Sequence, residues 1–182
     1  MKNKELYDLA ESLLNPGLNA LGFQHHAPPR ASWLRRTGTR FLRLLIEVHH
    51  NQRWLPHSGG AFNCWMGFSD STKQRVIAPE DSFSFDTLLD DAMLERRNEM
   101  RNRVIRKIIS TACADELSRM LKTSSDELFL LEMQRGIHRN SGGQFRFHDA
   151  EDVKSGCALI LELLPRIICE AETRVDSALA NS

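Results

Sequence analysis

Two segments in the first half of the chain, residues 40–50 and 61–69, alternate in polarity with a period of two. Their apolar side chains that share one face are Leu42, Leu44, Ile46, Val48, Phe62, Cys64, Met66 and Phe68. Because successive side chains of a strand point to opposite faces of its sheet, this spacing predicts two strands with one face in a core. The pattern is typical of an antiparallel sheet that is packed on one side.

Shorter strands are predicted on both sides of this pair. Residues 23–26 and 31–37 precede it, and the Thr-Gly-Thr sequence at 37–39 predicts a tight turn into the strand that begins at residue 40. Residues 144–148 alternate in the same way and predict one more short strand.

Helical spacing dominates the rest of the chain. Leucines repeat along residues 6–14, and Asn15-Pro16 predicts the cap of a second short helix that stops at Gly22. A long helical region is expected from a cap at Asp86 or Thr87, with a break near residues 98–102.

Two more helices are predicted in the C-terminal part. Ser124 and Glu127 have the spacing of a capping box, and the helix they open is expected to end near Gly136. Asp149 is expected to cap a helix that Pro165 either kinks or ends, with the last helix starting there.

This order predicts the α+β class in one domain, residues 1–182. We expect an N-terminal helix, an antiparallel meander of about four strands, and a mostly helical C-terminal part on one sheet face. A mostly helical domain with a small sheet is the alternative. The hydrophobic content of 41% and charged content of 26% are ordinary for globular proteins.

Cysteine usage predicts a reducing compartment. Cys64, Cys113, Cys157 and Cys169 form no C-x-x-C pair and fall in apolar segments, so we expect four buried free thiols. The sequence shows no signal-peptide core and no apolar run of about 18 residues, so we expect a cytoplasmic protein with no membrane contact.

Histidines near the strand ends raise the possibility of catalysis. One alternative is a small hydrolase-like or metal-dependent enzyme that uses some of His26, Glu47, His50 and His57. Adjacent histidines such as His49 and His50 point to opposite faces of a strand, and the loop that follows has no carboxylate to orient them. We therefore favour solvated strand-end histidines and predict no metal site.

Nucleotide and nucleophile motifs are missing from the sequence. The glycine pairs at 59–60 and 142–143 belong to neither a P-loop nor a dinucleotide fingerprint, and residues 67–71 lack the final glycine of a nucleophile elbow. We expect no cofactor.

Charge is polarised along a chain whose 24 basic and 24 acidic side chains cancel. The candidate binding surface is the arginine-rich hairpin together with the loop that follows it: Arg30, Arg35, Arg36, Arg40, Arg43, His50, Trp54 and His57. A second basic cluster lies at residues 96–107, and an acidic segment at 80–91 separates the two. The arginines could bind nucleic acid, with Trp33, Phe41 and Trp54 stacking on bases, or an acidic partner protein. We favour neutralisation of the arginines within the fold, so nucleic acid is not the favoured partner.

The start of the chain resembles a family of uncharacterised bacterial proteins that is known only as a domain of unknown function. The residues that carry this resemblance are Leu14, Asn15, Pro16, Leu18, Leu21, Gly22, Phe23, Trp33 and Arg35. The resemblance covers roughly residues 1–70, implies an α+β fold and supplies no catalytic residues. Together these observations favour a non-catalytic domain of adaptor or immunity type that binds another protein.

Overall fold

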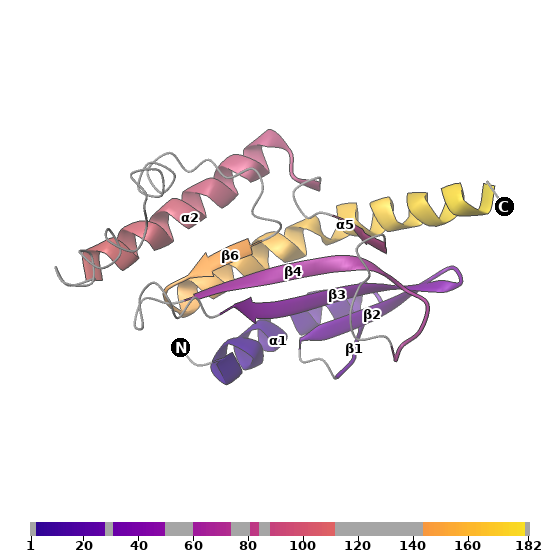
Figure 1. Cartoon of the computed structure of the whole chain (residues 1–182), viewed down its shortest axis with the longest axis horizontal. Helices are drawn as coiled ribbons and strands as arrows, with labels where there is room; N and C mark the ends of the chain where they lie inside the picture. Colours follow the sequence, from indigo (N-terminus) through magenta and orange to yellow (C-terminus); the bar gives the residue numbers. More distant parts are fainter. Residues whose placement is uncertain are drawn as a thin grey trace, which may run out of the picture.

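The computed structural model describes residues 3–27, 31–49, 60–73, 81–83, 88–111 and 144–180 (Figure 1). Its elements, in chain order, are α1 (Asn3–Ala20), β1 (Gln24–His25), β2 (Ser32–Thr37), β3 (Arg40–His49), β4 (Gly60–Ser69), β5 (Ser82–Phe83), α2 (Asp91–Thr111), β6 (Gln144–Phe147) and α5 (Ala150–Ala180). The α+β class is therefore confirmed.

The strands form one antiparallel sheet in the order β1-β2-β3-β4-β5, in which β6 also pairs with β4. β5 lies beside Met66 and Gly67, whereas β6 lies beside the other end of β4, so the two share one edge. The four strands of the expected meander are β1 to β4, and β6 lies at the strand predicted for residues 144–148. The path through the sheet also contains a fifth strand, the short β5, which was not predicted. Leu44 lies opposite Trp33 and Met66, and Ile46 lies opposite Cys64.

Helices α1 and α5 pack together behind the sheet and cover the face that the alternation predicted to be buried (Figure 1). The buried side chains on this face include Trp33, Leu42, Leu44, Ile46, Phe62, Cys64, Met66 and Phe68. Removing this apolar surface from water, at roughly 25 cal/mol per Å², is the main force that holds the two layers together.

The predicted break of the first helix at Asn15-Pro16 is wrong, because α1 is continuous and contains Pro16. Leu14 and Leu18, on either side of the proline, are both fully buried. Packing of this apolar stripe outweighs the loss of one backbone hydrogen bond at proline.

The predicted stop at Gly22 is confirmed. Gly22 has a φ of 81°, a left-handed conformation that glycine adopts without steric strain. The N–H of Phe23 donates to the carbonyl of Leu18 at 3.0 Å and the N–H of Gly22 to that of Asn19 at 3.0 Å. These two bonds make a Schellman motif, which satisfies the last carbonyls of α1.

Helix α2 starts later than predicted. Asp90, and neither Asp86 nor Thr87, caps it by accepting a hydrogen bond of 2.9 Å from the N–H of Met93. The helix also runs unbroken through residues 98–102, contrary to the prediction. The predicted helix between Ser124 and Gly136 lies outside the described residues.

The predicted cap of α5 is confirmed. Oδ1 of Asp149 accepts hydrogen bonds from the N–H groups of Glu151 (3.0 Å) and Asp152 (3.2 Å), and Oδ2 of Asp152 accepts from the N–H of Asp149 (3.2 Å). This reciprocal pair is an aspartate version of the capping box. Helix α5 continues through Pro165, so no new helix starts there.

Candidate functional site

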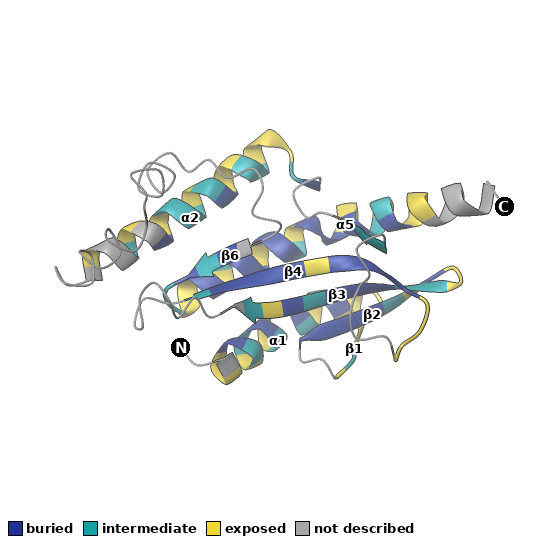
Figure 2. Cartoon of the chain, viewed as in Figure 1, coloured by how far each residue is buried: buried dark blue, intermediate teal, exposed yellow. Residues whose placement is uncertain are grey.

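Strand β4 is buried on both faces except at its centre. From Ala61 to Ser69 every residue is buried apart from Trp65, which is 39% exposed (Figure 2). Trp65 points away from α1 and α5, since its neighbours Cys64 and Met66 belong to the core. A large apolar side chain is therefore left in water at the middle of the sheet.

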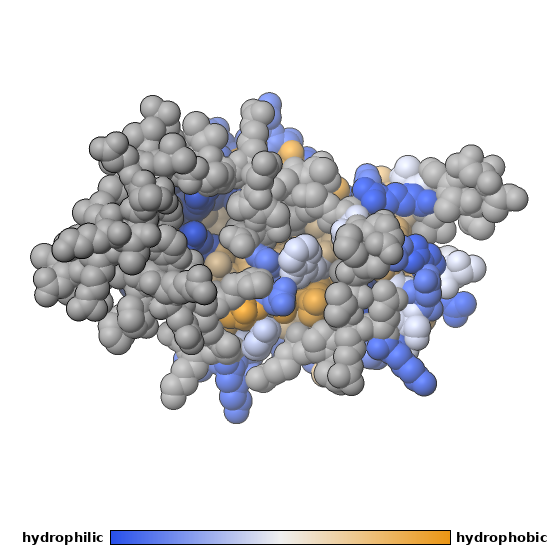
Figure 3. All heavy atoms as spheres, viewed as in Figure 1, coloured by the Kyte–Doolittle hydropathy of each residue, from blue (hydrophilic) through white to orange (hydrophobic). Residues whose placement is uncertain are grey.

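The side chain of Trp65 is held in place on this second face of the sheet. It lies directly opposite Leu45 in the register of β3 and β4, and its indole Nε1 donates a hydrogen bond of 2.9 Å to Oε2 of Glu47. Leu45 is half-buried and Glu47 is exposed. We call Leu45, Glu47 and Trp65 the tryptophan patch. Figure 3 shows apolar surface among hydrophilic side chains in the middle of this side of the molecule.

Polar residues around the patch are buried, contrary to the expectation of a sheet packed on one side. Ser32, Arg43, Asn63 and Ser69 are each at most 5% exposed. The guanidinium of Arg43 donates to Oγ of Ser32 at 2.8 Å and to the carbonyl of Thr72 at 3.3 Å. Burial lowers the pKa of Arg43. Within the described ranges no carboxylate pairs with it.

The remaining hairpin arginines are mostly engaged within the fold. Arg35 pairs with Glu172 of α5 at 3.2 Å. Arg36 is exposed, and its side chain donates to the carbonyl of Gly38 at 3.4 Å, with no carboxylate partner in the described ranges. Arg30 lies outside the described residues. The predicted surface is thus dispersed: one arginine reaches α5, one is buried and one is solvated.

Arg40 is neutralised by two carboxylates. It pairs with Asp70 at 2.6 Å and with Asp81 at 2.7 Å, and its guanidinium lies over the ring of Phe68. Burial alone would lower the pKa of Arg40, but the hydrogen bonds to Asp81 and Asp70 raise it. Asp81 belongs to the acidic segment, so this residue neutralises Arg40 as the neutralisation hypothesis predicts.

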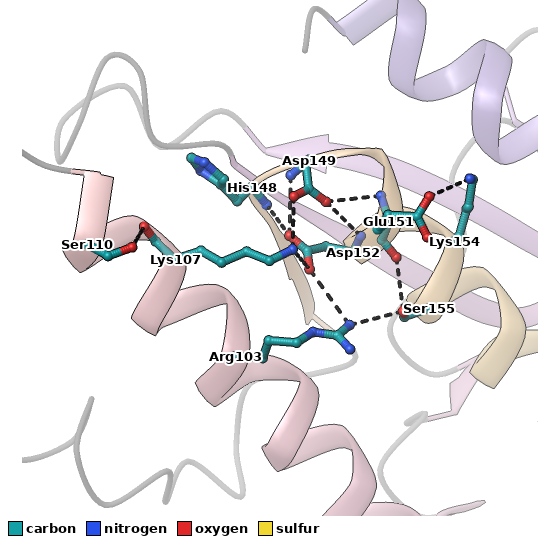
Figure 4. Close-up of polar contacts among 9 residues, drawn as sticks. All are labelled: Arg103, Lys107, Ser110, His148, Asp149, Glu151, Asp152, Lys154 and Ser155. Atoms are coloured by element: carbon teal, nitrogen blue, oxygen red, sulfur yellow. Dashed lines mark hydrogen bonds and ion pairs between the residues drawn. The ribbon is translucent and has the colours of Figure 1, made fainter.

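The second basic cluster docks α2 onto the start of α5 (Figure 4). Nζ of Lys107 lies 2.8 Å from Asp149 and 2.9 Å from Asp152, and Arg103 lies 3.7 Å from Asp152 and 3.0 Å from Oγ of Ser155. The hydrogen bond to Asp149, followed by that to Asp152, raises the pKa of Lys107. These basic residues hold two helices together.

Asp152 is the centre of this junction. Its carboxylate is almost fully buried and also accepts a hydrogen bond of 2.9 Å from the N–H of His148. A buried carboxylate needs such partners, because without them the charged form is strongly disfavoured. The sequence indicated Asp152 only as part of a helix cap, and its pairing with Lys107 was missed.

The predicted histidine site is only partly described. His26 is half-buried in the turn after β1, and Glu47 is held by Trp65. His50, Trp54 and His57 lie outside the described residues. Across the ranges that the structure describes, no three His, Cys, Asp or Glu side chains lie close enough to hold a metal ion.

Two of the aromatic residues that were predicted to stack on bases are fully or partly buried. Trp33 is fully buried in the core and donates its Nε1 to Asn15, while Phe41 is half-buried. Trp65 was not predicted as a site residue. The alternation along residues 61–69 already placed it on the face away from Cys64, so a search for tryptophans on the second face would have found it.

The cysteines are free but not all buried. Cys64 and Cys157 are buried, as expected, whereas Cys169 is exposed on α5. Cys169 follows the buried Ile167 and the half-buried Ile168, so the apolar neighbours wrongly indicated that it is buried too. Cys113 lies outside the described residues.

None of the helices in the described ranges combines the length and the apolar character needed to cross a membrane. Comparison of the chain with protein-family models, with curated proteins and with solved structures found no match.

Proposed function

We propose that this chain is a non-catalytic protein-binding domain of adaptor or immunity type, which holds its partner through the tryptophan patch. The observation that carries the proposal is Trp65, an exposed indole at the centre of a strand that is otherwise buried. Burying such a side chain releases a large apolar area, and tryptophan is enriched among the residues that dominate binding energy.

The hydrogen bond to Glu47 supports this role. It fixes the indole before binding, which reduces the conformational entropy lost when a partner covers the ring. We expect the partner to place an apolar side chain on Trp65.

The ion pairs of the hairpin favour a protein partner over nucleic acid. Arg35 and Arg40 are paired with carboxylates, and Arg43 is buried. Nucleic-acid affinity depends on cations that are free to neutralise phosphates, and these three arginines are engaged elsewhere. We further propose a cytoplasmic location, which the free thiols favour, and membership of the uncharacterised bacterial family that the N-terminal residues resemble.

A partner capture with two matched variants tests the proposal. Trp65→Ala removes the exposed indole, and Leu21→Ala removes the other large hydrophobic side chain that is exposed in the described ranges, at 36%. We expect the tagged protein to retain one stoichiometric protein partner from the source cell. Trp65→Ala should lose at least about tenfold in affinity for it, while Leu21→Ala binds normally.

Both variants need equal melting temperatures for this comparison to hold. A partner that binds Trp65→Ala as tightly as the unmodified chain would contradict the proposal. Sedimentation of the purified protein over a range of concentrations identifies a second copy as the occupant, because self-association through the patch would also disappear in Trp65→Ala.

A further inference from the structure

A cavity of about 650 Å³ is lined by residues of α2 and α5. Its polar wall consists of Arg96, Glu99, Asn102, Arg103, Arg106 and Ser155. On α2 these residues recur at intervals of three to four, so one stripe of the helix faces the cavity. The volume is within the range of small-molecule sites, about 300–1,000 Å³.

Guanidinium groups supply unused donors in this cavity. Arg106 is exposed and has no hydrogen bond or ion pair to the part of the chain that the structure describes. Arg96 uses Nη1 for Glu162, and Arg103 uses Nη2 for Ser155 and Asp152. Each guanidinium carries five N–H donors, so both keep several for a ligand.

Asn102 adds a polar side chain to the lining of the cavity. Met100 and Ala158 add apolar surface to the lining.

The charged side chains that line the cavity favour one position for an anionic ligand. Glu99 also lines the cavity, and it lies two helical turns, about 10 Å along the axis, from Arg106. Repulsion from Glu99 disfavours an anion beside it, and Asp152 lies 3.7 Å from Arg103. Arg106, which is farthest along α2 from Glu99, is therefore the favourable position for the anion. Guanidinium groups bind phosphate oxygens with two parallel hydrogen bonds.

We propose that this cavity binds a small phosphorylated molecule. Its phosphate groups lie at Arg106 and at the N–H groups of Arg103 that are not bound to Ser155 or Asp152. The site is independent of the protein-binding proposal, because it shares no residue with the tryptophan patch.

Calorimetric titration with inorganic pyrophosphate at low ionic strength tests the phosphate end. Arg106→Gln removes the guanidinium that has no partner in the described ranges. Arg36→Gln is the matched control, because Arg36 is an exposed hairpin arginine with no carboxylate partner among the same residues. We expect the dissociation constant to rise at least about tenfold in Arg106→Gln and to stay unchanged in Arg36→Gln. The side-chain amide signal of Asn102 should shift during the titration.

Three outcomes would overturn the proposal. The unmodified chain could show no binding, or both variants could weaken binding equally, which would indicate general charge attraction. A hexaglutamate peptide could bind in an Arg106-dependent manner while pyrophosphate does not, and the cavity would then be a site for an acidic protein segment. Arg106 is exposed, so Arg106→Gln should fold normally, and an unchanged melting temperature verifies that.

Discussion

The indole Nε1 of Trp33 donates a hydrogen bond of 2.7 Å to Oδ1 of Asn15, which joins the core strand β2 to the middle of α1. Trp33 is fully buried, so its indole N–H loses its hydrogen-bond partner if this acceptor is removed. Asn15→Ala should therefore lower the free energy of unfolding by about 1–3 kcal/mol, the cost of a buried donor without a partner.

Asn19→Ala is the control for this prediction, because Asn19 lies one turn later on α1 and its side chain is exposed. We expect a change of about 0.5 kcal/mol or less, measured by urea unfolding. Equal losses in the two variants would mean that Asn15 acts through helix propensity instead of through Trp33.

The role of Asn15 shows where local sequence signals fail. Asn-Pro has the composition of a helix start, but Leu14 and Leu18 continue the apolar stripe across it, and their burial keeps α1 intact. The alternation of apolar and polar residues predicted the buried faces of β3 and β4 correctly. A shift of a strand by one residue would turn every core side chain to the other face of the sheet, so the pattern allows one orientation only. Short elements such as β5, with only two residues, have no periodicity to detect.

Two helical glycines should respond differently to alanine. A Cβ on Gly156 would lie 2.9 Å from Cζ of Phe62 and 3.2 Å from Cδ1 of Phe145, two rings that stack at 5.2 Å. Rigid rings between the sheet and α5 have little room to move, so Gly156→Ala should destabilise the protein by about 1–3 kcal/mol through overpacking. This loss exceeds the roughly 1 kcal/mol that alanine gains in helix propensity.

At Gly17 the Cβ would meet only the end of the Leu161 side chain, with Cδ2 at 2.6 Å and the next atoms at 3.6 Å. Leu161 is half-buried and can change rotamer. Gly17→Ala should therefore lie within about 1 kcal/mol of the unmodified chain. Urea unfolding of both variants checks the pair, and a larger loss at Gly17 than at Gly156 would refute this account of the packing.

Acid should weaken the junction between α2 and α5. The hydrogen bond from Lys107 holds the pKa of Asp149 below its ordinary value. A carboxyl whose pKa is lower in the folded state contributes stability above its unfolded pKa, near 3.9, and loses it as the pH falls through the folded pKa. The raised pKa of Lys107 also stabilises the folded state. This stability does not change in acid, because it is lost only when the pH rises through the pKa of Lys107 in strong base.

Asp149→Asn isolates this effect, since asparagine still caps α5 but carries no charge. We expect the free energy of unfolding to fall less between about pH 5 and about pH 3 in Asp149→Asn than in the unmodified chain. Glu95→Gln, at an exposed carboxyl of α2, serves as the control. Parallel pH profiles for Asp149→Asn and the unmodified chain would show that the ion pair adds nothing to stability.

The candidate sites were harder to predict than the fold because their partners are distant in sequence. Lys107 and Asp152 are 45 residues apart, and Arg35 and Glu172 are 137 residues apart. Charge clustering indicated that the basic residues needed partners, but only the packing of α5 against β2 and α2 determines that Arg35 meets Glu172 and that Lys107 meets Asp152. The alternation along residues 61–69 predicts the face on which Trp65 lies. Its exposure cannot be predicted in this way, because it depends on what covers the neighbouring residues.

The cysteines provide a last test of the core. Burial is the main cause that raises the pKa of Cys64, with the neighbouring Cys157 adding to it, and burial raises the pKa of Cys157 to about 12. The thiolate is the reactive form, so both thiols should resist alkylation in the folded protein for two reasons, low access and low ionisation. Cys169 is exposed and should react first.

Iodoacetamide labelling followed by peptide mass spectrometry measures each site separately. In the native protein we expect modification at Cys169, and protection at Cys64 and Cys157 that ends only when urea unfolds the chain. Both protected thiols should become reactive at the same urea concentration, because β4 and α5 belong to one core cluster. If Cys157 reacted well before Cys64, α5 would separate from the sheet before the sheet itself unfolds.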